Sequence, residues 1–171
     1  ACLFPLVAKH VEAQSLPPIP AVVEDKRGYL SGEDSKDLAA AALKSLREGD
    51  EHGMKSKLQG LSLWPGLIRE GKEVAIALGH YANGNWGEAI ESATATLRDD
   101  ASQEEQCDAH QIIALAYFRM PLLCLAQDHA DRALRMDKTR RGASNLLKLV
   151  EEIAGGRYAS QVIVKNHVEI E

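Results

Sequence analysis

Two stretches of this chain repeat the same pattern of small and apolar residues 37 positions apart, as from Ala89 to Ala126. The segment 84–100 (GNWGEAIESATATLRDD) aligns with 121–137 (PLLCLAQDHADRALRMD). The matching positions are Ala89 with Ala126, Ala93 with Ala130, and Leu97 with Leu134. A weaker copy at 38–65 places Gly49 opposite Gly84. A repeat of this length indicates helical units that stack on one another, because one unit alone cannot bury its apolar face.

Alanine-rich and leucine-rich stretches after Ser35 have the spacing of amphipathic helices. They predict seven helices, near residues 35–47, 51–62, 67–82, 86–99, 103–119, 122–136 and 139–154. Ser102 with Glu105, and Asn85 with Glu88, have the spacing of a capping box, which satisfies free amides at a helix start. Short breaks at glycine or proline separate the helices. We therefore predict an all-α fold.

The chain divides into a helical domain with an extension at each end. Residues 1–34 are apolar patches interrupted by prolines and glycines, so we expect an irregular extension there. Residues 35–155 form the helical domain, and the Gly155–Gly156 pair should end its last helix. In the tail, 156–171, apolar and polar residues alternate from Tyr158 onward, which is the pattern of a β-strand that pairs with another edge. A flexible terminus is the alternative for this tail.

The repeated hairpins resemble tetratricopeptide (TPR) repeats, which are helix pairs of about 34 residues. In that family, small residues lie where two helices cross closely. The best copy has matching residues at the signature positions of the family, namely Ala114, Tyr117, Ala126 and Ala133. The resemblance covers residues 35–138 and implies about three TPR-like units, with 139–154 as a C-terminal capping helix. Length and repeat number are also similar to the small TPR chaperones of bacterial type III secretion.

The resemblance further implies where a partner would bind. Stacked repeats form a concave groove that is lined mainly by the first helix of each hairpin. The candidate partner-binding residues in that groove are Leu43, Leu46, Val74, Leu78, Tyr81, Gln111, Leu115 and Phe118. Most of them are apolar, which suits an apolar segment or the apolar face of an amphipathic helix. Some of them belong to the core instead if the true register differs by one or two positions.

These features predict a protein–protein interaction module that acts as an adaptor or chaperone. The alternative is a structural subunit of a larger assembly, which contacts its neighbours through its termini and outer face. Two apolar N-terminal segments, FPLV and LPPIPAVV, could themselves occupy the groove. The partner is another protein or peptide segment in either case, and a homodimer or hetero-complex is open.

The composition argues against several other classes of function. The net charge is −5 and the basic residues are scattered, so we expect no nucleic-acid partner. Three cysteines, a small and odd number, favour a reducing compartment, and we expect a cytoplasmic protein. No apolar run approaches the roughly 18 residues that span a bilayer, so we expect no membrane insertion. The start, 1–10, lacks a basic region and is broken by Pro5, unlike a signal peptide.

The sequence predicts no enzyme, cofactor or metal site. It has no Gly-rich phosphate loop, nucleophile elbow or HExxH motif. Cys107 with His110 and Cys124 with His129 offer four soft ligands, but five residues on a helix rotate His129 about 140° from Cys124. Both pairs cannot then face one metal ion. His80 has no neighbouring nucleophile and no carboxylate at a telling spacing.

Overall fold

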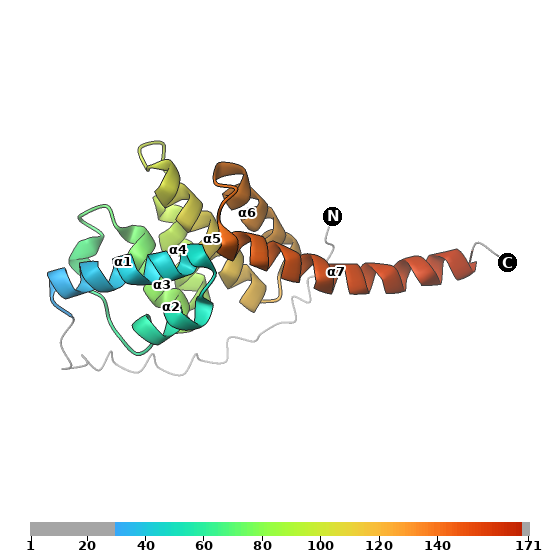
Figure 1. Cartoon of the computed structure of the whole chain (residues 1–171), viewed down its shortest axis with the longest axis horizontal. Coiled ribbons are helices and arrows are strands. Elements are labelled where there is room, and N and C mark those ends of the chain that lie inside the picture. The colour runs from blue at the N-terminus through green and yellow to red at the C-terminus, as the bar shows by residue number, and fades with distance from the viewer. Residues whose placement is uncertain (1–29, 169–171) are drawn as a thin grey trace, which may run out of the picture.

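The computed structural model describes the backbone of residues 30–168 and the side chains of residues 30–155. Every regular element in this range is a helix (Figure 1), so the all-α prediction is confirmed. The elements are α1 (Gly32–Glu48), α2 (Glu51–Leu58), the 3-10 helix η1 (Pro65–Leu67), α3 (Glu73–Ala82), α4 (Trp86–Thr96), α5 (Gln103–Arg119), α6 (Leu123–Met136) and α7 (Arg141–Val168). The expectations for residues 1–29 and 169–171 lie outside the described residues, and so does the expectation that residues 1–10 are not a signal peptide.

Local sequence explains where several helices begin. Ser102 and Glu105 form the expected capping box at the start of α5, where the Glu105 amide donates to the Ser102 hydroxyl oxygen at 3.2 Å. The second expected box is wrong, because Asn85 makes no side-chain capping hydrogen bond at the start of α4. The Glu88 carboxylate lies instead 3.2 Å from Nδ1 of His80 on α3. The carboxylate of Glu88, which the local sequence pattern predicted in a helix cap, therefore contacts the neighbouring helix α3.

One difference from the predicted helices lies between α2 and α3. α2 ends at Leu58 and α3 begins only at Glu73, so residues 59–72 form a connecting loop that contains η1. Gly60 and Gly71 have φ values of +76° and +73°, which interrupt the right-handed helix that the apolar pattern suggested. The loop packs on the start of α1, where the amide of Trp64 donates a 3.0 Å hydrogen bond to Oγ of Ser35.

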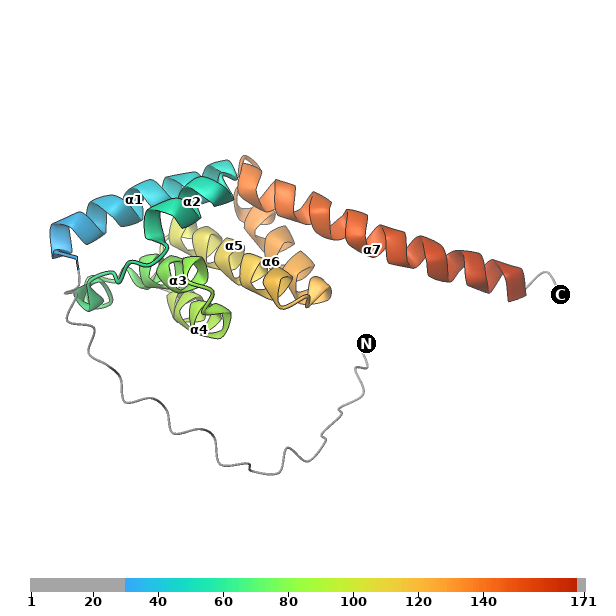
Figure 2. The same cartoon turned by 90° about the horizontal axis from the view of Figure 1, so that it is seen from below.

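The prediction for the C-terminal tail is also wrong, because α7 runs as a helix from Arg141 to Val168. The structure has neither a helix end at Gly155–Gly156 nor a strand over 158–168. A glycine costs a helix about 1 kcal/mol, but each residue added to a formed helix gains a backbone hydrogen bond. The packed first half of α7 supplies that formed helix, so alternation alone does not decide the structure of the tail. Figure 2 shows the second half of α7 projecting beyond the other helices.

The helices pack mainly on their neighbours in the chain, and α5 lies at the centre. α3 contacts both α1 and α5, while α7 contacts α5, α6 and also α1. The first and last helices therefore meet on one side of the body (Figure 2). Residues 107–116 of α5 are all buried. The alanines that repeat along the sequence, Ala89, Ala93, Ala126 and Ala130, have no exposed surface, as expected where small side chains let helices approach closely.

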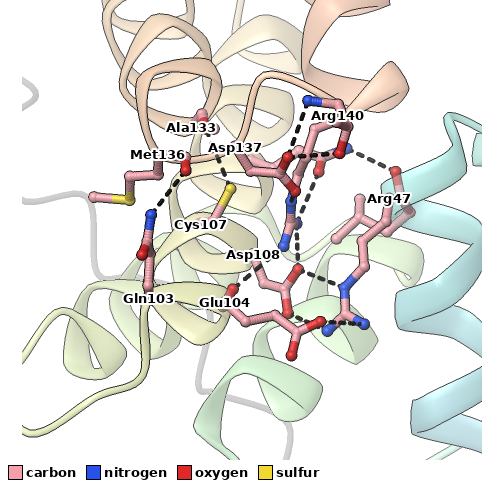
Figure 3. A network of polar contacts seen from close by, with 12 residues as sticks. Arg47, Gln103, Glu104, Cys107, Asp108, Ala133, Met136, Asp137 and Arg140 are labelled. Carbon is pink, nitrogen blue, oxygen red and sulfur yellow. Dashed lines mark hydrogen bonds and ion pairs between the residues drawn. The ribbon is translucent and has the colours of Figure 1, made fainter.

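A buried ion network joins α1, α5 and the turn before α7 (Figure 3). The carboxylate of Asp108 on α5 lies between the guanidinium groups of Arg47 and Arg140. Arg47 donates to its two oxygens at 3.0 and 2.7 Å, and Arg140 donates to one of them as well. The hydrogen bond to Asp108 raises the pKa of Arg47, so this guanidinium stays charged. The network links α1 and the start of α7 to α5, and its buried part is the pair of Asp108 and Arg140, because Arg47 is about one third exposed and also pairs with Glu104 at 2.9 Å. Removing the charge of Asp108 would leave the buried Arg140 with only the carboxylate of Asp137, 3.5 Å away.

Candidate partner-binding cleft

A cleft opens where α1 ends and α2 begins, between these helices, α5 and α7. Its volume is about 220 Å³. The residues that line it are Leu46, Gly49, Glu51, Gln111, Leu115, Phe118, Arg119, Gly142, Asn145, Leu146 and Leu149. We call it the α5–α7 cleft. It is larger than the roughly 150 Å³ apolar cavity that holds a benzene molecule, so it has room for an aromatic or branched side chain.

Backbone groups form one end of this cleft. Nε2 of Gln111 donates a 2.7 Å hydrogen bond to the carbonyl oxygen of Leu46 in the last turn of α1. Gly142 of α7 lies against both groups, and a Cβ atom there would overlap them. Gly49 ends α1 with a φ of +82°, beside Gly142 and Asn145. These glycines let α1 and α7 approach each other closely, and the two helices together form one wall of the cleft.

The interior of the cleft is apolar. Leu46 from α1, Leu115 from α5 and Leu146 from α7 are buried at its base. Phe118 is half-buried, and Leu149 is 43% exposed. A partner side chain that enters the cleft would therefore contact these apolar groups and cover Leu149. This is the surface expected for an apolar anchor residue.

Charged groups also line the cleft, at the start of α2 and the end of α5. The carboxylate of Glu51 accepts a 2.6 Å hydrogen bond from the hydroxyl of Tyr81 and also pairs with Arg119 and Lys55. Burial alone would raise the pKa of Glu51, but hydrogen bonds from Tyr81, Arg119 and Lys55 outweigh it and lower the pKa below its ordinary value. The Tyr81 and Glu51 hydrogen bonds raise the pKa of Arg119. The cleft thus has a charged pair at its edge that can orient polar groups of a ligand.

The structure brings four of the eight candidate residues into this cleft. They are Leu46, Gln111, Leu115 and Phe118. Val74 and Leu78 are buried within the core around α3, and the ring of Tyr81 is buried while its hydroxyl reaches Glu51. Leu43 is half-buried on α1 and does not line the cleft. The first helices of the hairpins thus contribute fewer exposed side chains than the resemblance implied.

The contribution of α7 to the cleft was not predicted from the sequence. Asn145, Leu146 and Leu149 line the cleft, although residues 139–154 were expected only to cap the last repeat. The apolar spacing of Leu146, Leu149, Val150 and Ile153 was the available signal, since it marks one face of a helix. The approach of α7 to α1 depends on Gly142, and a single glycine carries no such signal in a sequence.

A histidine pair lies apart from the cleft, between α5 and α6. The Nδ1 atoms of His110 and His129 are 3.0 Å apart, and the ring of Tyr117 lies beside His129. Cys107, which the sequence paired with His110 as a candidate metal ligand, donates a hydrogen bond from its thiol to the carbonyl oxygen of Ala133 at 3.2 Å (Figure 3). Among the residues with described side chains, no group of three or more His, Cys, Asp or Glu could hold a metal ion.

The helices and the α5–α7 cleft define the class of protein, which is an all-α protein with a small apolar cleft. The chain matches no family model, no curated protein and no solved structure. Within residues 30–168, no helix combines the length and the apolar character that crossing a membrane requires.

Proposed function

We propose that this chain is a TPR-type repeat protein that binds an apolar or amphipathic segment of another protein in the α5–α7 cleft. In this proposal α1 with α2, α3 with α4, and α5 with α6 are the three repeat units, and α7 caps them. The observation that carries it is the apolar lining of the cleft, in which Leu46, Leu115 and Leu146 form the buried base and Leu149 is exposed. We propose no catalytic step for this protein. We also propose a cytoplasmic location, because three cysteines, a small and odd number, favour a reducing compartment.

The size of the cleft suits one or two anchor side chains. Complete burial of a Leu, Ile, Phe or Met side chain contributes about 1.5–3 kcal/mol. One anchor therefore gives weak binding alone, because association costs at least about 4 kcal/mol of lost translational and rotational freedom. Further contacts along the rim, including hydrogen bonds to Asn145 and to the Glu51–Arg119 pair, would supply the rest. The expected partner segment has an apolar anchor flanked by polar residues.

A matched pair of surface variants tests this function. Leu149→Glu places a charge in the cleft, whereas Leu125→Glu places the same charge on α6, away from it. Both leucines are 43% exposed, so neither change disturbs the buried core. Partners recovered from a cell extract with the wild type and with Leu125→Glu should be lost with Leu149→Glu. Recovery of the same partners by all three proteins would rule out the cleft as the binding site.

A permanent structural subunit is the second candidate. The observation in its favour is the part of α7 that projects beyond the body (Figure 2), since such a helix offers surface to a neighbour. An adaptor or chaperone releases its client, so part of the protein should be recovered free of any partner protein. If the wild type and the Leu149→Glu variant were both recovered only in a large particle, the structural subunit would be favoured.

A further inference from the structure

A second apolar surface lies on the loop 59–72. Leu61, Trp64 and Ile68 are 39%, 37% and 49% exposed. A groove of about 480 Å³ adjoins them, and its apolar lining comes from Leu61, Leu63, Pro65, Ile68 and Ile76. We call Leu61, Trp64, Ile68 and this groove the loop surface. Apolar side chains gathered in one exposed place mark a contact site.

The described part of the chain begins against this surface. The amide of Leu30 donates a 3.4 Å hydrogen bond to the carbonyl oxygen of Ser62, which is itself a lining residue of the groove. Gly32 lies under the ring of Trp64, where a Cβ atom would be 3.1 Å from Cε3. The described part of the chain therefore starts next to the loop surface.

The segment 16–23 (LPPIPAVV) has the chemistry to cover it. Three prolines restrict φ and remove backbone donors, so the segment is unsuited to a helix or a central strand. Its extended form is the polyproline II conformation, which docks on grooves lined by aromatic side chains. Trp64 provides such a side chain. The apolar residues that would contact the loop surface are Leu16, Ile19, Val22 and Val23.

The length of the chain between segment 16–23 and the loop surface also fits this contact. A polar spacer, 24–29, separates this segment from Leu30, and six residues span roughly 20 Å when extended. The α5–α7 cleft lies near the other end of α1, a helix about 25 Å long. The loop surface is therefore the nearer apolar site. A tether this short gives an effective concentration on the order of millimolar, so even a weak contact is well populated.

We propose that residues 16–23 dock on the loop surface of their own chain. The contact covers Leu61, Trp64 and Ile68 and holds the N-terminal extension at the end of α1 that is far from the α5–α7 cleft. The cleft then stays open to a partner. This inference does not depend on the proposed function, since the arm can cover the loop whether or not the cleft binds anything.

Photo-cross-linking of the full chain tests the contact. p-Benzoylphenylalanine replaces Ile19 in one protein and, as the matched control, Leu6 in another, and both are irradiated in dilute solution. We expect the probe at position 19 to form cross-links to residues 60–76 in a product that runs as a monomer on a denaturing gel. The probe at position 6 should give far fewer cross-links to that region.

Each other outcome overturns the proposal. A product of twice the mass would show that a second copy supplies the segment. Cross-links to residues that line the α5–α7 cleft would place the arm there instead. Equal yields from the two positions, or no cross-link from position 19, would show that 16–23 has no specific contact with the loop surface.

A second pair of variants checks the surface itself in the chain that carries the probe at position 19. Ile68→Glu should lower the yield of the intramolecular cross-link by about tenfold, because it places a charge under the apolar segment. Leu125→Glu makes the same change at a similarly exposed leucine on α6 and should leave the yield unchanged. An unchanged yield with Ile68→Glu would overturn the proposal even if the first cross-link were found.

Discussion

Gly142 allows α7 to lie directly against α1 and α5. A Cβ atom at this position would overlap Nε2 of Gln111 and the carbonyl oxygen of Leu46. Since the carbonyl belongs to the backbone of α1, it cannot move aside as a flexible side chain would. We expect Gly142→Ala to lower the free energy of unfolding by about 1–3 kcal/mol through overpacking. Denaturation by urea, followed by far-UV circular dichroism, measures the change.

Gly87 provides the control for this substitution. It lies inside α4, its φ is not positive, and a Cβ atom there would meet nothing within 4 Å. Gly87→Ala should therefore raise the free energy of unfolding by up to about 1 kcal/mol, because alanine favours a helix. Equal effects of the two substitutions would show that α7 does not approach α1 as closely as described.

The pair of His110 and His129 predicts a dependence of stability on pH. Burial, reinforced by the positive charge that His129 and Arg132 can carry, lowers the pKa of His110 to about 4 from an ordinary value of 6.5. Burial also lowers the pKa of His129. The unfolded chain therefore binds protons that the folded chain excludes. The free energy of unfolding should be highest above pH 6.5 and should fall as the pH decreases towards 4.

Urea denaturation at pH 7, 6 and 5 tests this expectation. His110→Gln should make the loss of stability between pH 7 and pH 5 smaller, because one of the two excluded protons is removed. His52→Gln, at an exposed position on α2, should leave the loss unchanged. A wild-type protein whose stability is constant over this range would contradict the assignment of two neutral histidines.

At the scale of the helices, Asp108 decides how α1 and α7 are held on α5. Asp108→Asn keeps the shape of the side chain but leaves Arg47 and Arg140 facing each other without a negative charge between them. Breaking a buried ion pair in this way typically costs about 3–5 kcal/mol, so we expect a loss of that size in the free energy of unfolding. Thermal and urea denaturation both measure it.

The matched control is Asp128→Asn on α6. Asp128 pairs with Arg132 four residues later at 3.1 Å, but both side chains are about half exposed. Exposed helical pairs contribute roughly 0.3–0.5 kcal/mol, so this substitution should have little effect. If both variants lost the same small amount, the network around Asp108 would not be what fixes these helices.

The helices themselves could largely be predicted from the sequence, and α5 shows why. Ser102 and Glu105 mark its start and Pro121 follows its end, so both limits have local causes. Residues 59–72 and the tail after Gly155 could not be predicted in the same way. In the loop, the helical pattern of apolar residues is outweighed by two left-handed glycines, and in the tail a glycine pair is outweighed by propagation from a packed helix.

The cleft was only partly predictable for a related reason. Leu46, Gln111, Leu115 and Phe118 share the inner faces of α1 and α5, which periodicity can identify. The part played by α7 depends on how closely it approaches α1. That distance is set by Gly142, Gln111 and the Asp108 network, which lie far apart in the sequence and form only when the helices pack.

At the scale of the whole molecule, contact between the first and last helices should make unfolding cooperative. Repeat proteins in which each unit touches only its neighbours can unfold in parts, because their stability is a sum of local terms. Here α7 packs on α1 as well as on α5 and α6. Loss of α7 from the body would therefore also expose the end of α1. We expect one transition for the body and no stable intermediate that lacks α7 alone.

Leu146→Ala tests this coupling from the C-terminal end. Leu146 is buried in α7, so its truncation should lower the free energy of unfolding by about 2–5 kcal/mol. The two tryptophans, Trp64 and Trp86, lie on the loop before α3 and at the start of α4, and neither is on α7. In a cooperative body, the unfolding midpoint seen by tryptophan fluorescence should fall as far as the midpoint seen by circular dichroism. Leu149→Ala, at an exposed position of the same helix, should shift neither midpoint appreciably. Fluorescence that stays unchanged while circular dichroism reports earlier unfolding would show that α7 detaches by itself, and that its contact with α1 does not couple the two ends of the body.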